Sequence, residues 1–429
     1  MSTQTPPATV DVEIRAVASG GDGVGELPDG RVVFVPRTAP GDRVRVRVDQ
    51  DRSSWARAAL VEILGEGDAR VEPPCPLYAR CGGCQLQHLP YASQLEWKGR
   101  FVTDALERIG KLPDAPDPDV VPSPRIERYR SRMTFTLRRL RGGRVVAGLH
   151  ALDRPGHVVD IHDECLLPRS GLLRSWVELR DQWGGGAHRL PDGGRLRLHL
   201  RTVGSGVELL VEGGAPGWRS GGLLDDVPSL AAVWHRPTGD HRAALVAGVS
   251  DPGGGDAFEQ VNPEVADALY DHVVRVSAAE RPSEGTPSPR AVVEAYCGAA
   301  TVGRRLAARG DRVVGIERNA SAVEAARHEA PSGLQVVEGP VEQHLAAHLP
   351  CDTLIVNPPR TGLDDPVPDI VRSAPPPKLV YVSCDPATLA RDVALLKSRF
   401  RLTGLRSFDL FPHTAHVETV AVLSRGEGA

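Results

Sequence analysis

Three cysteines lie close together in the first quarter of the chain, at Cys75, Cys81 and Cys84. This C-x5-C-x2-C spacing can bring three thiolates to one metal centre, because the glycines between the last two let the backbone turn tightly. A fourth ligand is needed, and Cys165 is the candidate. A zinc ribbon usually brings two C-x2-C pairs, so a triplet with one remote cysteine favours an iron–sulfur cluster over structural zinc.

Two other residues could carry covalent and proton-transfer chemistry. Cys384 follows a predicted strand and precedes Asp385 and Pro386, which can begin a helix. A helix N-terminus favours the thiolate that a nucleophile needs, while the charge of Asp385 acts in the opposite direction; an inert buried cysteine is the alternative. Glu418 opens an apolar strand, where burial would raise its pKa and make it a proton acceptor. A salt-bridged edge glutamate is the alternative reading.

The last third of the chain has the pattern of a nucleotide-binding fold. Residues 292–317 predict a strand, a small-residue turn at Gly298, a helix, and a second strand ending on Glu317. Such a turn lets a ligand approach backbone N–H groups, and the acid can meet ribose hydroxyls. Dehydrogenases and purely structural turns share this pattern. A later strand, residues 352–356, runs into Asn357 at the carboxyl end of the sheet, where open α/β folds bind ligands.

The elements that must position these residues fall into several domains, because 429 residues exceed what one core normally serves. The first 70 residues predict a small β-barrel, and residues 129–255 predict an antiparallel sheet with glycine-rich turns. A helix is expected over 93–109, opened by a Ser93 capping box and closed near Gly110. The expected barrel strands are 32–36, 44–48 and 58–64; a Pro/Asp-rich connector is expected over 113–124, and a flexible insertion over 279–290.

Charge and composition give weaker indications. The net charge of −4 argues on its own against a nucleic-acid partner, yet eight arginines and one acid lie between Arg125 and Arg144. Such a stripe suits phosphate binding, although 47 of the 51 basic residues are arginine and a coding bias would look similar. Without a visible signal peptide or long apolar segment, we expect a cytoplasmic monomer with free cysteines and no membrane partner.

Taken together, these motifs resemble the S-adenosylmethionine-dependent RNA uracil-5 methyltransferases that carry an iron–sulfur cluster. The N-terminal barrel is similar to the RNA-binding TRAM domain, and the cysteine triplet with Cys165 matches the family's cluster ligands. The other matching segments, in the family's order, are Phe258-Glu259-Gln260-Val261-Asn262, Tyr296-Cys297-Gly298, Asn357-Pro358-Pro359-Arg360, Ser383-Cys384-Asp385-Pro386 and His416-Val417-Glu418-Thr419.

The resemblance implies a multidomain α/β fold with three parts. A TRAM-like, OB-like barrel would cover 1–70, and a central antiparallel-sheet domain that faces RNA and bears the metal cluster would cover 71–92 and 120–255. A Rossmann-like class I methyltransferase domain would cover 93–119 and 256–429.

The resemblance also assigns roles residue by residue. Cys384 matches the nucleophile and Glu418 the general base. The implied S-adenosylmethionine-binding residues are Gln260, Tyr296, Gly298, Thr301, Glu317 and Asn357, and the implied ligands of a 4Fe-4S cluster are Cys75, Cys81, Cys84 and Cys165. The sequence departs from the family where an acid is usual at Asn357, where another polar residue is common at Thr301, and where a phenylalanine pair is replaced by Phe258-Glu259.

The implied reaction is methyl transfer to carbon 5 of a uridine through a covalent adduct of Cys384 with carbon 6. Ribosomal RNA, 23S in particular, is the expected substrate, with transfer RNA as the alternative. Two other function classes remain open. An amino-group RNA methyltransferase could use Asn357-Pro358-Pro359, and a non-catalytic RNA-binding adapter would need none of the catalytic residues.

Overall fold

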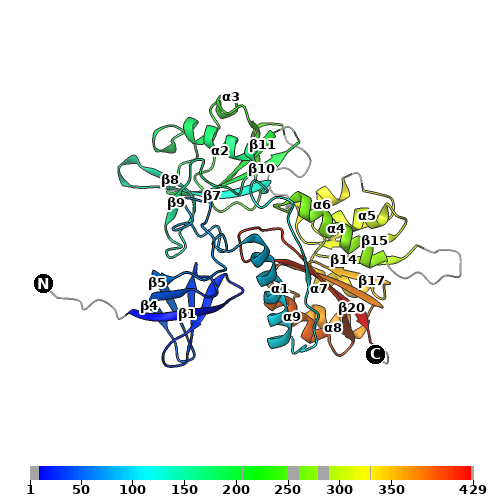
Figure 1. The fold of residues 1–429 in the computed structure, drawn as a ribbon. Coiled ribbons are helices and arrows are strands. Elements are labelled where there is room, and N and C mark those ends of the chain that lie inside the picture. Colours follow the sequence, from blue (N-terminus) through cyan, green and yellow to red (C-terminus); the bar gives the residue numbers. More distant parts are fainter. Residues whose placement is uncertain (1–8, 205, 250–259, 279–288, 329, 427–429) are drawn as a thin grey trace.

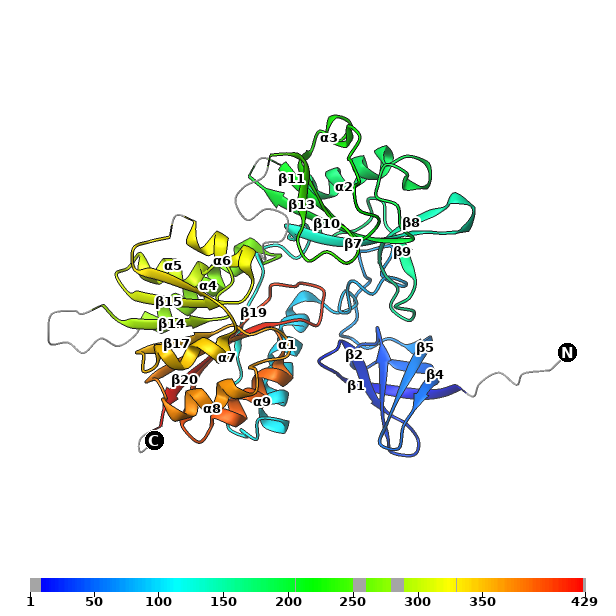
Figure 2. The ribbon, with the colours of Figure 1, turned by 180° about the vertical axis from the view of Figure 1, so that it is seen from behind.

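The computed structural model describes residues 9–204, 206–249, 260–278, 289–328 and 330–426. Figures 1 and 2 show three parts: an N-terminal barrel, a central sheet, and a larger α/β sheet that contains the C-terminus. Helix α1 lies against the α/β sheet, although the barrel and the central sheet flank it in the sequence. Residues 250–255 of the predicted antiparallel sheet, the Phe258-Glu259 pair and residues 279–288 of the expected insertion lie outside the described residues.

The N-terminal part is a closed barrel, as predicted. Valines that alternate along the strands point inward, and Val33, Val44 and Val46 are completely buried. Their period of two is the signal that made three of the strands visible in the sequence. The barrel strands, in the spatial order β1-β2-β3-β5-β4, are β1 (Thr9–Val17), β2 (Asp22–Glu26), β3 (Val32–Pro36), β4 (Arg43–Asp51) and β5 (Trp55–Gly65).

The central part is a seven-stranded sheet in the order β13-β12-β11-β10-β7-β8-β9. Its pairs are antiparallel, as expected, except that β11 and β12 run parallel. Helix α2 (Ser170–Gln182), which the sequence did not predict, covers it with Trp176 stacked on Phe135. The other elements are β7 (Arg132–Arg139), η1 (Arg141–Gly143), β8 (Val145–His150), β9 (Val158–Asp160), η2 (Gly185–Ala187), β10 (Arg195–Val203), β11 (Gly206–Glu212), α3 (Leu223–Asp226), β12 (Leu230–Arg236) and β13 (Ala244–Gly248).

The third part is an eight-stranded sheet in the order β16-β15-β14-β17-β18-β20-β19-β6, with β20 antiparallel to both neighbours. Consecutive residues on each strand face opposite layers, so Val380 packs with α4, α5 and α6 while Leu379 packs with α7, α8 and α9. The strands are β6 (Asp119–Val121), β14 (Ala291–Ala295), β15 (Arg312–Glu317), β16 (Leu334–Glu338), β17 (Thr353–Val356), β18 (Lys378–Ser383), β19 (Phe400–Phe408) and β20 (Glu418–Arg425). The helices are α4 (Pro263–Ala278), α5 (Thr301–Ala307), α6 (Ala320–Arg327), α7 (Val341–His344), η3 (Leu345–His348), α8 (Pro366–Ser373) and α9 (Pro386–Leu396).

The predicted start of the first helix was wrong. Helix α1 (Tyr91–Arg108) begins directly after Pro90, and no side chain caps it. Ser93 therefore lies inside the first turn and is no capping residue. The helix begins earlier because the side chains of Tyr91 and Gln94 form hydrogen bonds with distant segments. Its end agrees with the prediction, since the backbone N–H of Gly110 donates to Ala105 at 3.1 Å.

The expected Pro/Asp-rich connector contains strand β6, which the sequence did not predict. Its three residues pair in parallel with β19, with Val120 opposite Ser407. A strand this short shows no readable period, so only the long-range pairing defines it. Along the described ranges, no helix combines the length and the apolar character needed to cross a membrane.

Candidate active site

The predicted site residues gather at one edge of the third sheet. Ala295 on β14 pairs with Ile316 on β15 and with Val356 on β17, and Val356 pairs with Tyr381 on β18. The carboxyl ends of these parallel strands are therefore level, and the residues that follow them meet along one line. Strand β20 runs the other way and begins at this edge. The residues brought here are Tyr296, Glu317, Asn357, Cys384 and Glu418.

Cys384 lies between strand β18 and helix α9. The Asp385 carboxylate accepts a hydrogen bond from the Thr388 backbone N–H at 2.9 Å, and Pro386 is the first helical residue, as predicted. Burial raises the pKa of the half-buried Cys384 thiol, and the charge of Glu418 raises it further. The positive charge of the nearby Arg360 guanidinium lowers this pKa in part. The sequence alone did not determine the direction in which the thiol pKa shifts. In the structure this pKa is raised, which disfavours the thiolate.

Glu418 is the first residue of β20 and is only 5 % exposed. Burial raises the pKa of its carboxyl to about 8, and the positive charge of Arg360 opposes that shift. The predicted desolvation is confirmed, and the alternative of a salt-bridged edge residue is not what the structure contains. Cys384 and Glu418 are close enough for each to respond to Arg360 and for Glu418 to raise the thiol pKa. A carboxyl with this pKa can accept a proton near neutral pH.

Arg360 joins this site although the sequence gave it no catalytic role. Its guanidinium lies 3.3 Å and 3.4 Å from the two ring nitrogens of the exposed His416. The His416 ring in turn meets Phe411 edge to face, with centroids 5.7 Å apart. In the sequence, the position of Arg360 directly after the Asn357-Pro358-Pro359 turn could have indicated that it lies at the site.

The loop after β14 forms the second half of the site. The Glu317 carboxylate accepts hydrogen bonds from the backbone N–H of Gly298 at 3.0 Å and of Asn319 at 2.8 Å. Tyr296 and Ala300 have φ angles of 59° and 54°. Both residues of this loop are therefore held in the left-handed conformation that residues other than glycine rarely adopt. No atom lies within 4 Å of where a Cβ on Gly298 would stand. The space beside this glycine is open to a ligand.

Other candidate residues surround this loop. The Tyr296 hydroxyl donates to Asp364 at 3.1 Å, and Thr301 is the first residue of α5. Beneath the helix, burial raises the pKa of the Glu294 carboxyl to about 8, and this carboxyl accepts the Gly303 N–H at 2.8 Å. Gln260 lies beside the residue that precedes β7, where its backbone oxygen accepts a hydrogen bond from the Ser131 hydroxyl at 3.4 Å.

A separate pocket contains the four candidate metal ligands. It holds about 330 Å³ of space free of protein atoms, including open solvent, and Cys75, Cys81, Cys84 and Cys165 all line it. The four cysteines are free, and the Gly83 N–H points at the Cys81 sulfur from 3.4 Å. In the part of the chain that is described, no three histidine, cysteine or acidic side chains are arranged as the ligands of a single metal ion.

The chain turns at Gly82 and Gly83, between Cys81 and Cys84, as predicted. Neither Gly82 nor Gly83 has a positive φ. A Cβ on Gly83 would instead lie 2.6 Å from the Leu149 side chain and 3.4 Å from the Cys81 sulfur. A side chain at Gly83 would therefore force the end of the Leu149 side chain to move, so the packing of the pocket wall favours glycine.

The arginine stripe divides into two sets. Arg125, Arg138, Arg141 and Arg144 are exposed, while the other four are partly buried. Arg139, for example, donates five hydrogen bonds to backbone carbonyls of the 186–193 segment. Within the exposed set, Arg138 also donates to the Gly156 carbonyl and Arg125 lies 3.6 Å from the Glu264 carboxylate; RNA contact by this set stays a prediction.

The strand order, with β20 inserted antiparallel beside β18, and the open loop after β14 define a class I methyltransferase fold. Comparison with known families agrees. Residues 343–426 match the tRNA (Uracil-5-)-methyltransferase family, and residues 5–61 match the TRAM domain.

Full-length relatives share this layout. An uncharacterized RNA methyltransferase of Nitratidesulfovibrio vulgaris is 33% identical over 475 residues, which cover 100% of this chain and 98% of the relative. One from Gloeobacter violaceus is 34% identical and covers 97% of this chain and 96% of its own. The crystal structure of Pyrococcus abyssi tRNA (uracil-54, C5)-methyltransferase in complex with S-adenosyl-L-homocysteine aligns with a TM-score of 0.70 and 26% identity, over 96% of this chain and 99% of that one. The chain belongs to this family of S-adenosylmethionine-dependent RNA uracil-5 methyltransferases and is an enzyme.

Proposed function

We propose that this enzyme transfers a methyl group to carbon 5 of a uridine in RNA, with Cys384 as nucleophile and Glu418 as general base. The observation that carries the proposal is the pairing of a thiol and a buried carboxyl at one sheet edge, both next to Arg360. An amino-group methyltransferase would have no use for Cys384 in this position.

The chemistry requires these groups together. Carbon 5 of uracil is a poor nucleophile until the Cys384 sulfur bonds to carbon 6 and the π electrons move toward oxygen 4 as an enolate. S-adenosylmethionine supplies the electrophilic methyl group. Once carbon 5 carries the methyl group, Glu418 takes the carbon 5 proton, the carbon 6–sulfur bond breaks, and the double bond re-forms. Arg360 favours the first step because its charge lowers the pKa of the thiol.

The cofactor residues fit this proposal. Glu317 is already fixed beside Gly298 by two backbone hydrogen bonds, so its carboxylate can meet ribose hydroxyls beside an open loop. Tyr296, Thr301, Asn357 and Gln260 are the further candidates. Asn357 is exposed and neutral, so it would hold its ligand by hydrogen bonds alone. In the proposed division of the chain, residues 93–119 and 256–429 form the methyltransferase domain, although Val120 and Val121 of β6 also pair with β19 in the sheet of that domain.

The barrel and the exposed arginines support RNA as the substrate. A uracil stacked in folded RNA must be extruded to reach Cys384, and the barrel with the exposed arginines would grip the backbone around it. We infer ribosomal RNA as the substrate from the layout of the chain. The similarity to a transfer RNA enzyme of Pyrococcus abyssi makes transfer RNA the second candidate.

Nucleoside analysis tests this function. The purified enzyme should be incubated with isotope-labelled S-adenosylmethionine and, in separate reactions, with unmodified ribosomal and transfer RNA. Mass spectrometry of the digested RNA should find the label in 5-methyluridine. Label in a base-methylated adenosine or cytidine would instead favour the amino-group alternative, and the RNA that accepts the label identifies the substrate class.

We also propose that the cysteine pocket holds a 4Fe-4S cluster. Four cysteines from two distant segments share one pocket, and the Gly83 N–H is aimed at a ligand sulfur, a contact that stabilises cluster thiolates. Methyl transfer needs no net electron transfer. The cluster would therefore act as a structural link between the segment after the barrel and the loop at Cys165.

Anaerobic purification tests the cluster. We expect a brown protein with about four iron atoms per chain, because each cysteine would ligate one iron. Cys84→Ser should lose most of the iron, whereas Cys351→Ser, at a buried cysteine outside the pocket, should retain it. A colourless protein with stoichiometric zinc would contradict the cluster and leave the methyl-transfer proposal intact.

A further inference from the structure

A buried ion pair joins helix α1 to the segment that precedes Glu418. The Lys98 ammonium lies 2.5 Å from the Asp409 carboxylate, and both side chains are 0 % exposed. The ammonium also donates to the Phe411 backbone oxygen at 3.0 Å. Such a pair is weak evidence for stability, because apolar residues of similar volume often stabilise a core as well or better. The role of this ion pair therefore depends on the segments that it holds in position.

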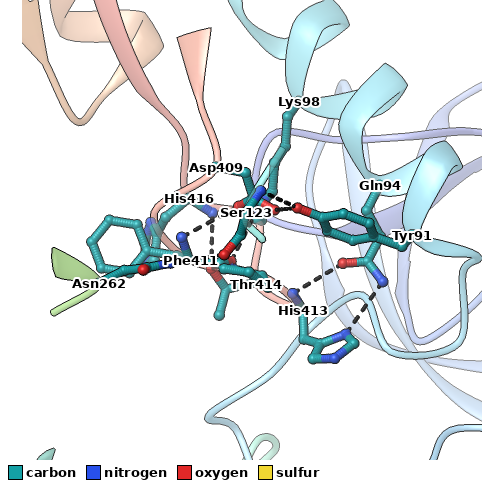
Figure 3. A network of polar contacts seen from close by, with 12 residues as sticks. Tyr91, Gln94, Lys98, Ser123, Asn262, Asp409, Phe411, His413, Thr414 and His416 are labelled. Atoms are coloured by element: carbon teal, nitrogen blue, oxygen red, sulfur yellow. Dashed lines mark hydrogen bonds and ion pairs between the residues drawn. The ribbon is translucent and has the colours of Figure 1, made fainter. Parts of the chain in front are cut away.

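One branch of this network runs toward the candidate cofactor residues (Figure 3). The Tyr91 hydroxyl donates to Asp409 at 2.8 Å and accepts the Ser123 backbone N–H at 2.8 Å. The Ser123 hydroxyl accepts a hydrogen bond from the Asn262 amide at 3.0 Å. Asn262 is fully buried and lies two residues after Gln260. The branch thus links the ion pair to the segment that carries Gln260.

A second branch anchors the far end of the 409–417 loop (Figure 3). The Gln94 side chain accepts the His413 backbone N–H at 3.0 Å, and its amide lies 3.3 Å from the His413 ring. His413 has a φ of 67°, a left-handed conformation that these contacts must maintain. The Thr414 hydroxyl donates to Phe411 at 2.8 Å and accepts the His416 N–H at 3.3 Å.

The anchored loop is the connection from β19 to β20, and it ends at Glu418. Phe408, immediately before Asp409, is the register partner of Glu418 in the sheet. The loop also carries His416, which meets Arg360 beside Cys384. The hydrogen bonds and the ion pair of Lys98 reach Asp409 and Phe411, at the start of the loop, and not Glu418, Arg360 or Cys384. Its influence on them must pass through the loop.

We propose that Lys98, paired with Asp409, is a positioning residue that sets the geometry of Glu418 at the proton-removal step. The inference rests on the proposed role of Glu418 as the base. A base displaced by about 1 Å can lose on the order of 10²-fold in rate. Loss of the pair should therefore slow proton removal more than formation of the covalent adduct.

The test variant is Lys98→Met with Asp409→Asn, which removes both charges and leaves one amide oxygen that can still accept from the Tyr91 hydroxyl, while the Phe411 N–H, which meets the other carboxylate oxygen, loses its acceptor. This avoids the unpaired buried charge that a single substitution would leave and that could unfold the protein. The control is Arg290→Met with Asp311→Asn, an ion pair whose carboxylate is 1 % exposed and whose arginine side chain is 15 % exposed; the two residues directly precede β14 and β15, at the opposite edge of the sheet.

The measurement is the amount of denaturation-resistant protein–RNA complex, together with turnover, in the presence of S-adenosylmethionine. We expect turnover of the Lys98/Asp409 variant to fall on the order of 10²-fold while the covalent complex accumulates, with neither change in the Arg290/Asp311 control. If the Lys98/Asp409 variant turns over as fast as the wild-type enzyme and no covalent complex accumulates, the inference is overturned. It is also overturned if the Arg290/Asp311 control loses as much turnover as the Lys98/Asp409 variant. If Glu418→Gln still traps RNA, such a failure concerns Lys98 alone; if Glu418→Gln traps none, the proposed function fails as well.

Discussion

Replacing Cys384 with alanine should abolish methyl transfer to RNA. The proposed nucleophile is the only group that can activate carbon 5, so its loss should lower turnover on the order of 10⁴–10⁶-fold, the effect seen when an enzyme's nucleophile is removed. Burial and the nearby Glu418 raise the pKa of this thiol, whereas Arg360 lowers it, so its reactivity depends on this particular surrounding. Transfer of labelled methyl groups to RNA measures the effect.

The control for this substitution is Cys351→Ala, which removes another buried thiol with a raised pKa, located just before β17 at the opposite edge of the sheet. It should retain turnover within a few-fold. RNA binding by Cys384→Ala should also persist, because the exposed arginines and the barrel are untouched. Methylation that survives in Cys384→Ala at near wild-type rates would rule out the covalent mechanism.

Replacing Glu418 with glutamine should trap the enzyme on its RNA. Glutamine keeps the shape of the side chain but accepts no proton, so the carbon 5 proton stays and the carbon 6–sulfur bond persists. Turnover should fall about 10²–10⁴-fold while a covalent protein–RNA complex builds up in the presence of S-adenosylmethionine. Denaturing gel electrophoresis measures that complex directly.

Glu294→Gln is the matched control, since Glu294 is also a buried carboxyl whose pKa is raised to about 8, but it lies under α5 and binds the Gly303 N–H. This variant should trap no RNA. Trapping by both glutamine variants would mean that buried carboxyls affect the site indirectly.

The turnover of the wild-type enzyme should rise with pH toward about 8. Burial keeps the Glu418 carboxyl protonated below its pKa, and only the ionised form accepts the proton.

Local patterns in the sequence predicted the parts of the site that lie at strand ends. The strand before Cys384 and the Asp385-Pro386 start of α9 each depend on a few neighbouring residues, and both are confirmed. The burial of Glu418 was visible in the same way, because apolar residues follow it along one strand. Short-range periodicity and capping therefore located the two residues on which the chemistry depends.

Long-range contacts determined what the sequence did not predict. Lys98 and Asp409 are 311 positions apart, and no local pattern connects them. The same contacts explain the error at Ser93, because Tyr91 is drawn into the helix by its bond to Asp409. Strand β6 also exists only through its distant partner β19. The sequence did not predict that Arg360 lies near the Cys384 thiol, because this proximity depends on the ends of β17 and β18 meeting at one edge of the sheet.

The most direct test of the account is to identify the bond between protein and RNA. The complex trapped by Glu418→Gln should be digested with protease and nuclease, and the peptide that carries a nucleotide should be sequenced by mass spectrometry. We predict a nucleotide on Cys384 whose mass corresponds to a methylated uridine. A nucleotide on any other residue, or 5-methyluridine formed by an enzyme that never bonds to its RNA, would contradict the mechanism.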